Sequence, residues 1–305
     1  MAGLTRQARG RKRELPTTEY SLSTVDIDPV ALAAYDKVCE FRLTDELPAT
    51  YPHVLGFPLQ TKLMTDDDFP FPLIGLVHVA NRITQRRPIR VDDRPTIKVH
   101  VENLRPHPKG RQFDMISEAS LGGEAVWTDV STYLRRGETA AEGVEGAGGD
   151  KPAGGVGSAG PDKQAGSVGS AGPDKQAGGE KPKHRKESAP EAGVPNAIWR
   201  VPDDIGRRYA EVAGDANPIH LHPLTAKAFG FPRAIAHGMW AKARCLAAFE
   251  GRLPDAYTVD VRFKLPVLLP GKVAFTATQV DRGWHFLLTD ARSDKPHLEG
   301  TITPA

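Results

Sequence analysis

The residues best suited to chemistry lie in one short stretch of the second half of the chain. Asp215 and His220 are close in sequence, and Pro218 lies between them. Because proline prevents a continuous helix, we expect both side chains on an irregular turn, where they can converge on one point. A carboxylate and an imidazole that share one water molecule can take a proton from it and return a proton elsewhere. The spacing therefore predicts an acid–base pair.

A glycine farther along the chain completes this arrangement. Gly238 lies where a long helix is expected to begin, and the first N–H groups of a helix have no partner inside it. These groups face any oxygen that becomes negatively charged, and the absence of a side chain lets a substrate carbonyl approach closely. A base, an acid and such an oxyanion donor are the parts required for proton chemistry next to a carbonyl group.

Each of the three residues also has an ordinary structural explanation. Asp215 alone is typical of a turn, a lone His220 is more often a surface or core residue than a catalyst, and Gly238 is an ordinary start of a helix. The ordered conjunction of all three favours the chemical interpretation, because Asn-Pro-Ile (residues 217–219) stands between the acid and the base.

A metal centre is the alternative for the histidines of this region. His220, His222 and His237 form a three-histidine set, and catalytic zinc often takes three protein ligands. Loosely spaced histidines are common, however, and no cysteine or His-x-x-x-His helix accompanies them. The pattern therefore predicts no metal at this site.

The elements that position these residues belong to a chain with two folded halves. We expect a disordered basic tail (residues 1–18), a first domain (19–136), a disordered Gly/Ala/Pro-rich linker (137–195) and a second domain (196–305). Within the linker, residues 156–166 recur as residues 168–178. A segment this polar and glycine-rich cannot bury enough apolar surface to fold, so the repeat is expected to be a flexible tether.

Both halves show the same order of predicted elements. Each begins with a helix, expected over residues 30–41 in the first half and over residues 202–213 in the second, with Asp28 and Asp203 at their starts. Each ends with strands of alternating apolar and polar residues, at 76–83, 96–104, 113–121 and 125–134, and at 258–263, 272–281, 284–291 and 297–303. The main difference is a helix over residues 239–250 in the second half, with Gly251 as its stop. A long apolar helix with antiparallel strands predicts an α+β domain whose sheet wraps the helix.

The composition excludes several classes of function. The 305 residues include 40 Lys and Arg against 38 Asp and Glu, so the strongly basic surface of a nucleic-acid-binding protein is not expected. The mean hydropathy of −0.39 and the absence of a long apolar run argue against a membrane span. Cys39 and Cys245 lie in apolar stretches, are expected in the core, and fit a protein of the reducing cytoplasm.

The chemistry-bearing stretch resembles a known family. Residues 214–220 (Gly-Asp-Ala-Asn-Pro-Ile-His) and 235–239 (Ile-Ala-His-Gly-Met) resemble the MaoC-like, (R)-specific enoyl-CoA hydratases, also called hydratase 2, and residues 262–271 are similar to a later signature of that family. The resemblance implies a double hot-dog fold, in which two curved antiparallel sheets, each around a central helix, form an intramolecular pseudo-dimer. Over the first half the resemblance is architectural only, because residues 47–64 carry no Asp-x-Asn-Pro-x-His pattern.

The resemblance also implies a role for each residue of the site. The pair would activate a water for addition across a trans-2-enoyl thioester, or in reverse dehydrate an (R)-3-hydroxyacyl thioester, in fatty-acid metabolism. The implied catalytic residues are Asp215, His220 and Gly238, and Asn217, His237 and Ala236 would bind or orient the substrate. Coenzyme A or acyl-carrier protein is then part of the substrate, and no separate cofactor is needed. A homodimer of pseudo-dimers is a further expectation.

Two other functions stay open at this point. A hot-dog acyl thioesterase uses an acidic residue on the same scaffold, although the five-residue step from Asp215 to His220 favours a hydratase. A non-catalytic acyl-binding subunit would be favoured if Asp215 or His220 were missing, and both are present. The apolar stretches 57–59 and 69–73 of the first half either fill a core or leave room for a long acyl chain.

Overall fold

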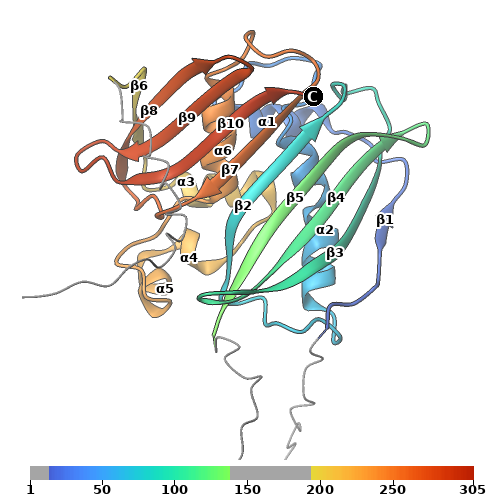
Figure 1. The fold of residues 1–305 in the computed structure, drawn as a ribbon, viewed down its shortest axis with the longest axis horizontal. Coiled ribbons are helices and arrows are strands. Elements are labelled where there is room, and N and C mark those ends of the chain that lie inside the picture. Colours follow the sequence, from blue (N-terminus) through green and yellow to red (C-terminus); the bar gives the residue numbers. More distant parts are fainter. Residues whose placement is uncertain (1–13, 138–193) are drawn as a thin grey trace, which may run out of the picture. The chain divides into compact units, whose positions relative to one another are not determined.

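The computed structural model describes residues 14–137 and 194–305, and the elements are drawn in Figure 1. The predicted tail up to residue 13 and the linker residues 138–193 lie outside the described residues, so the expectations about them stay predictions. In the first half the elements are β1 (Tyr20–Leu22), α1 (Pro29–Cys39), α2 (Tyr51–Thr65), β2 (Leu76–Gln85), β3 (Thr96–His107), β4 (Gly110–Leu121) and β5 (Glu124–Arg136).

The second half repeats this layout with additional short helices. Its elements are β6 (Ala197–Val201), α3 (Ile205–Ala213), α4 (Pro218–Leu221), α5 (Pro223–Ala228), α6 (Gly238–Ala247), β7 (Tyr257–Phe263), β8 (Gly271–Val280), β9 (Gly283–Asp290) and β10 (Pro296–Pro304). Every predicted strand is therefore present, and its ends differ from the prediction by a few residues. The short strands β1 and β6 were not predicted.

All ten strands of the described residues form one sheet, in the order β1-β3-β4-β5-β2-β7-β10-β9-β8-β6. Counted outward from its middle, each half follows the same order of strands, as two related copies would. The copies join through antiparallel pairing of β2 with β7, from Ala80 opposite Arg262 to Gln85 opposite Tyr257. We call this strand pair the seam. The double hot-dog fold is thereby confirmed, with its two sheets continuous across the seam.

The first half has a central helix that the pattern of residues did not predict. Helix α2 begins after Thr50 and includes Pro58 in its interior. Its buried face carries the polar side chains of His53 and Gln60 as well as apolar ones, so no clean apolar stripe marks it. The pattern of residues indicated a long helix in the second half alone and is wrong on this point, whereas the resemblance implied a central helix in each half, which is confirmed. A proline and a polar buried face obscured a helix that tertiary packing stabilises.

The core lies between the sheet and the helices. Figure 1 shows α1, α2 and α6 against the same face of the sheet. Leu59, Phe69 and Phe71 of the first half are buried in this core, which favours the core-filling interpretation of those apolar stretches. Both cysteines are buried and unpaired, as predicted. None of the helices in the described residues is long and apolar enough to cross a membrane.

Candidate active site

The catalytic stretch follows α3. This helix begins at Ile205 after Asp204, slightly later than predicted, and ends at Ala213. Gly214 follows as the capping residue and takes the left-handed conformation with φ 75°. Asp215 comes next in an irregular loop, as expected. His220, in contrast, lies on the one-turn helix α4, because Pro218 occupies the first turn of that helix, where its missing N–H costs nothing. The expected irregular turn is therefore correct for Asp215 and wrong for His220.

His220 is held in one orientation by its own segment of chain. Its Nδ1 lies 2.8 Å from the main-chain oxygen of Ile235, and a nitrogen facing a carbonyl oxygen must carry the proton. In the neutral ring the other nitrogen, Nε2, is then an acceptor and a potential base. Burial lowers the pKa of His220, and the charge of Asp215 opposes that shift only in part. The ring is therefore neutral near pH 7.

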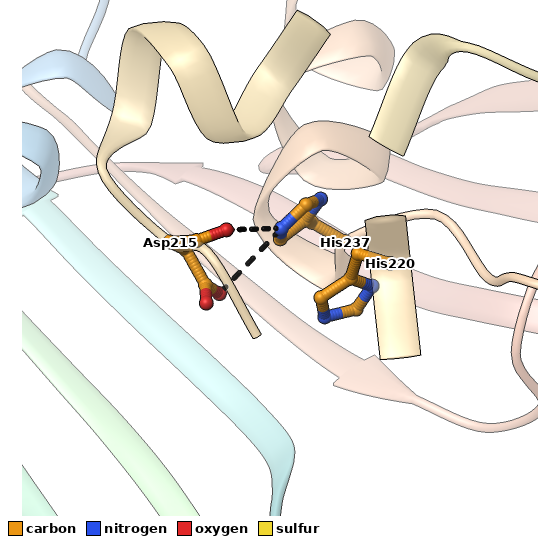
Figure 2. A group of neighbouring side chains, drawn as sticks. All are labelled: Asp215, His220 and His237. Carbon is orange, nitrogen blue, oxygen red and sulfur yellow. Dashed lines mark hydrogen bonds and ion pairs between the residues drawn. The ribbon is translucent and has the colours of Figure 1, made fainter. Parts of the chain in front are cut away.

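His237 connects the loop of Asp215 to the ring of His220 (Figure 2). Its Nε2 donates to the main-chain oxygen of Asp215 at 3.0 Å and lies 3.7 Å from Oδ2 of the same residue. Its ring stacks on that of His220, with centroids 3.6 Å apart. Burial, and then His220, lower the pKa of His237 well below the usual value, so this ring is also neutral. Its Nδ1 is buried without a hydrogen-bond partner in the described residues.

The three side chains bring one carboxylate and two imidazoles to a single point. Ligand atoms of Asp215, His220 and His237 lie within 4.8 Å of one another, so the predicted convergence of acid and base is seen. The same three side chains are close enough to offer one ligand atom each to a metal ion. His222 is exposed and caps α5 by accepting from the N–H of Leu224. The three-histidine alternative is therefore not assembled.

Gly238 is the first residue of α6, as predicted to within one residue. Its N–H is one of those in the first turn that have no hydrogen-bond acceptor within the helix. A Cβ atom at this position would lie 3.1–3.2 Å from ring atoms of Phe263, which is tighter than ordinary van der Waals contact. The glycine therefore allows the start of α6 to pack closely on β7.

Two predicted substrate-binding residues are engaged in local hydrogen bonds. The side-chain oxygen of Asn217 accepts from the N–H of Ile219 and caps α4, while the N–H of Asn217 donates to Asp215 Oδ1. The N–H of Ala236 donates to the main-chain oxygen of Val267. Both residues thus shape the loop around Asp215 and His220, and their direct contact with substrate stays a prediction.

Other residues of the site carried no signal in the sequence. Gly206 of α3 lies so close to α4 that a Cβ would be 2.0 Å from the main-chain oxygen of His220. The ring of Phe57, in the first half, lies 3.7 Å from the place that a Cβ atom added to Gly214 would occupy. The pKa of Tyr133 is raised by burial and, next, by the charge of Asp215. The first half therefore contributes to the surroundings of the acid–base pair, which only the tertiary structure reveals.

Comparison with known proteins identifies relatives of the chain. Residues 174–299 match the model of the MaoC like domain. The chain is 36% identical over 292 residues to 3-hydroxyacyl-thioester dehydratase X of Mycobacterium tuberculosis, covering 96% of this chain and 91% of that relative. A crystal structure of HtdX from Mycobacterium tuberculosis covers 94% of this chain and 100% of its own, with a TM-score of 0.73 and 33% identity.

A more distant solved structure shows the same fold. The MaoC-like dehydratase from Phytophthora capsici is 18% identical, with a TM-score of 0.66 over 94% of this chain and 95% of its own. The likeness to HtdX, in contrast, extends to the sequence of both halves. With 36% identity over nearly its whole length, the chain belongs to the family of MaoC-like dehydratases.

Proposed function

We propose that the chain catalyses the reversible hydration of a trans-2-enoyl thioester to an (R)-3-hydroxyacyl thioester. The observation that carries this proposal is the convergence of Asp215, His220 and His237 within 4.8 Å, in the half that also presents the first turn of α6. Membership of the dehydratase family makes the protein a hydro-lyase. The (R) configuration, the acyl carrier and the roles of single residues are parts of the proposal.

In the hydration direction, His220 Nε2 and the Asp215 carboxylate hold one water and take its proton. The oxygen of that water forms a bond to C3 of the substrate, while the electron pair of the C2–C3 double bond moves toward the thioester carbonyl. The resulting enolate oxygen accepts from the Gly238 N–H, and the proton held by the pair then goes to C2. One such oxyanion donor supplies on the order of 100-fold in rate or more.

The reaction needs no separate cofactor, because the phosphopantetheine arm of coenzyme A or acyl-carrier protein is part of the substrate. As further parts of this proposal, the protein acts in fatty-acid metabolism in the cytoplasm and forms a homodimer of pseudo-dimers. An acyl thioesterase is less well supported. Hydrolysis would direct the activated water at the carbonyl carbon, whereas the five-residue step from Asp215 to His220 and the membership of the dehydratase family favour addition at C3.

The test uses the purified full-length chain with crotonyl-CoA and with longer enoyl-CoAs up to about sixteen carbons. We expect loss of enoyl absorbance and formation of a product that an (R)-specific, but not an (S)-specific, 3-hydroxyacyl-CoA dehydrogenase oxidises. Free thiol is measured in parallel. Release of thiol without loss of enoyl absorbance would establish the thioesterase instead, and an (S) product would overturn the proposed stereochemistry.

A further inference from the structure

A lysine is fully buried in the helix that begins at the oxyanion donor. Lys242 lies in α6, four residues after Gly238, and its relative exposure is 0%. Burying an ammonium ion costs several kcal/mol unless hydrogen bonds replace its hydration, and lysine is almost never fully buried unless it is paired. The reaction proposed above makes no use of this side chain.

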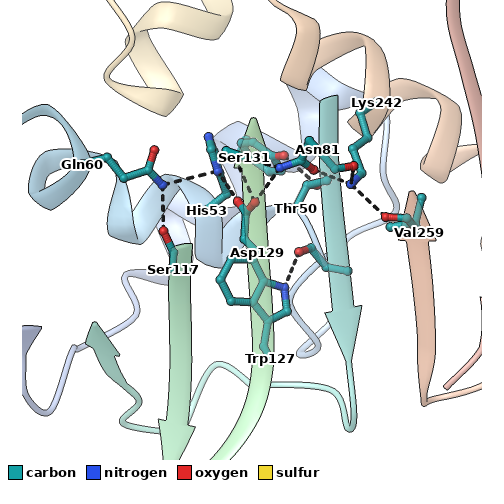
Figure 3. A network of polar contacts seen from close by, with 12 residues as sticks. Thr50, His53, Gln60, Asn81, Ser117, Trp127, Asp129, Ser131, Lys242 and Val259 are labelled. Carbon is teal, nitrogen blue, oxygen red and sulfur yellow. Dashed lines mark hydrogen bonds and ion pairs between the residues drawn. The ribbon is translucent and has the colours of Figure 1, made fainter. Parts of the chain in front are cut away.

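The ammonium group is bound by the two strands of the seam (Figure 3). Lys242 Nζ donates to the main-chain oxygen of Asn81 at 3.2 Å, to the side-chain oxygen of the same residue, and to the main-chain oxygen of Val259 at 3.3 Å. Burial lowers the pKa of Lys242 to about 7, and the charges of Asp129 and Asp260 oppose that shift. Three acceptors match the three N–H bonds of an ammonium group, so this geometry favours the protonated form.

Asn81 connects the ammonium group to other buried side chains of the first half. Its Nδ2 donates to Asp129 Oδ1 at 2.5 Å and to Ser131 Oγ at 2.9 Å. An amide is suited to this place because it offers an acceptor to the ammonium and donors to the carboxylate at the same time. Burial opposes the charge on Asp129, but His53 and Lys242 hold the pKa of its carboxyl below the usual value. The network therefore contains a buried cation and a buried anion joined by a neutral amide.

The far end of the network reaches the central helix of the first half. Asp129 Oδ2 lies 2.5 Å from Nδ1 of His53, and Gln60 of the same helix donates to Ser117 of β4 at 3.0 Å. Asp129, Asn81 and Ser131 are all 0% exposed. The hydrogen bonds thus run from α6 through β2 and β5 to α2, and connect the helices at the centres of the two halves.

Such an anchor constrains α6 more than apolar packing does. Apolar contacts are non-directional, so they permit a helix to slide and rotate slightly. An ammonium group bound to three fixed acceptors restricts both the sliding and the rotation of the helix that carries it. Gly238 and Lys242 are four residues apart and therefore lie on the same face of α6. A misplacement of about 1 Å in a catalytic group can cost about 100-fold in rate. An anchor at Lys242 can therefore fix the position of the Gly238 N–H.

We propose that Lys242 is a positioning residue, which through Asn81 and Asp129 of the non-catalytic half holds the start of α6 where its N–H meets the thioester oxygen. The proposal rests on the function proposed above. Under this proposal the first half contributes to catalysis by holding α6 in place, although it carries no catalytic motif. Because the oxyanion develops only in the transition state, loss of the anchor should lower kcat and leave KM nearly unchanged.

The test compares Lys242→Met with Arg105→Met in the full-length chain. Arg105 pairs with the buried Asp114 at 2.9 Å on the outer strands of the first half, so its substitution also leaves a carboxylate without its cation. We expect kcat for enoyl-thioester hydration to fall at least about tenfold in Lys242→Met, with KM within about twofold. Arg105→Met should keep the kcat of the wild type. Wild-type kcat in a folded Lys242→Met variant overturns the proposal.

A second variant keeps the test decisive if the unpaired Asp129 prevents folding of Lys242→Met. The double variant Lys242→Met with Asp129→Asn removes both buried charges, a change that is often neutral or stabilising. We expect it to fold, as judged by circular dichroism and Tm, and to retain the low kcat. A folded double variant with wild-type kcat would refute the positioning role. An inactive wild type in the same assay would instead refute the proposed function itself.

Discussion

At the scale of single residues, the structure separates the two histidines of the site. Nδ1 of His220 is hydrogen-bonded to the Ile235 carbonyl, so its Nε2 is free to act as a base. In His237, by contrast, Nε2 is the nitrogen that is hydrogen-bonded, to the Asp215 carbonyl. The motif placed both residues in the site, but it did not assign these opposite tautomers. His237 thus contacts both the loop of Asp215 and the ring of its neighbour, and we propose that Asp215 with His220 forms the pair that exchanges protons.

The first prediction concerns this pair. Asp215→Asn and His220→Ala should each lower turnover by several orders of magnitude, because an amide cannot take a proton and an alanine cannot hold the water. Their atoms converge on one point, so the double variant should be little worse than either single one. Steady-state kinetics on folded variants measures this. Multiplicative losses in the double variant, or near-wild-type turnover in a single one, would contradict a shared role.

At the scale of elements, close packing of α3 on α4 positions His220. A Cβ on Gly206 would lie 2.0 Å from the main-chain oxygen of His220, so a side chain there must push the two helices apart. Gly206→Ala should lower stability by about 1–3 kcal/mol, as overpacking does, and should also lower kcat. Urea unfolding and kinetics check both effects.

Gly137→Ala is the matched control, because a Cβ at that position meets nothing within 4 Å. It should change neither stability nor kcat. If Gly206→Ala behaved in the same way as this control, the close approach of α3 and α4 would not be needed for the site.

At the scale of the whole molecule, one buried carboxyl links folding stability to pH. Asp36 of α1 is 1% exposed, and one of its oxygens has no partner in the described residues. Burial, and then the charge of Glu250 in the second half, raise the pKa of Asp36 to about 7. The folded state therefore keeps this proton up to about pH 7, while the unfolded chain releases it near pH 4.

Stability should accordingly fall as pH rises from about 4 to 7, because the folded state binds more protons over that range. An asparagine cannot ionise and avoids this loss. Asp36→Asn should raise the free energy of unfolding at pH 8 by about 1–2 kcal/mol, because the neutral amide carries no cost of ionisation in the folded state. At pH 4 the variant should match the wild type. Urea unfolding at both pH values, with the exposed Asp67→Asn as control, tests the sign; a loss of stability at pH 8 would refute it.

What the sequence by itself determined is local. The acid, the base and the oxyanion glycine stand in one ordered stretch, and the strands show a period of two, so the α+β class and the candidate residues Asp215, His220 and Gly238 could be read from the chain. The family and the double hot-dog fold came from the resemblance of that stretch to a known motif. The pattern of residues did not reveal helix α2, because Pro58 and the polar residues of its buried face hid its period. The anchor of α6 could not be seen either, since Asn81 and Lys242 are 161 residues apart. Residues so far apart in the sequence are buried together and paired only because the sheet brings β2 against β7. These contacts are therefore visible only in the tertiary structure.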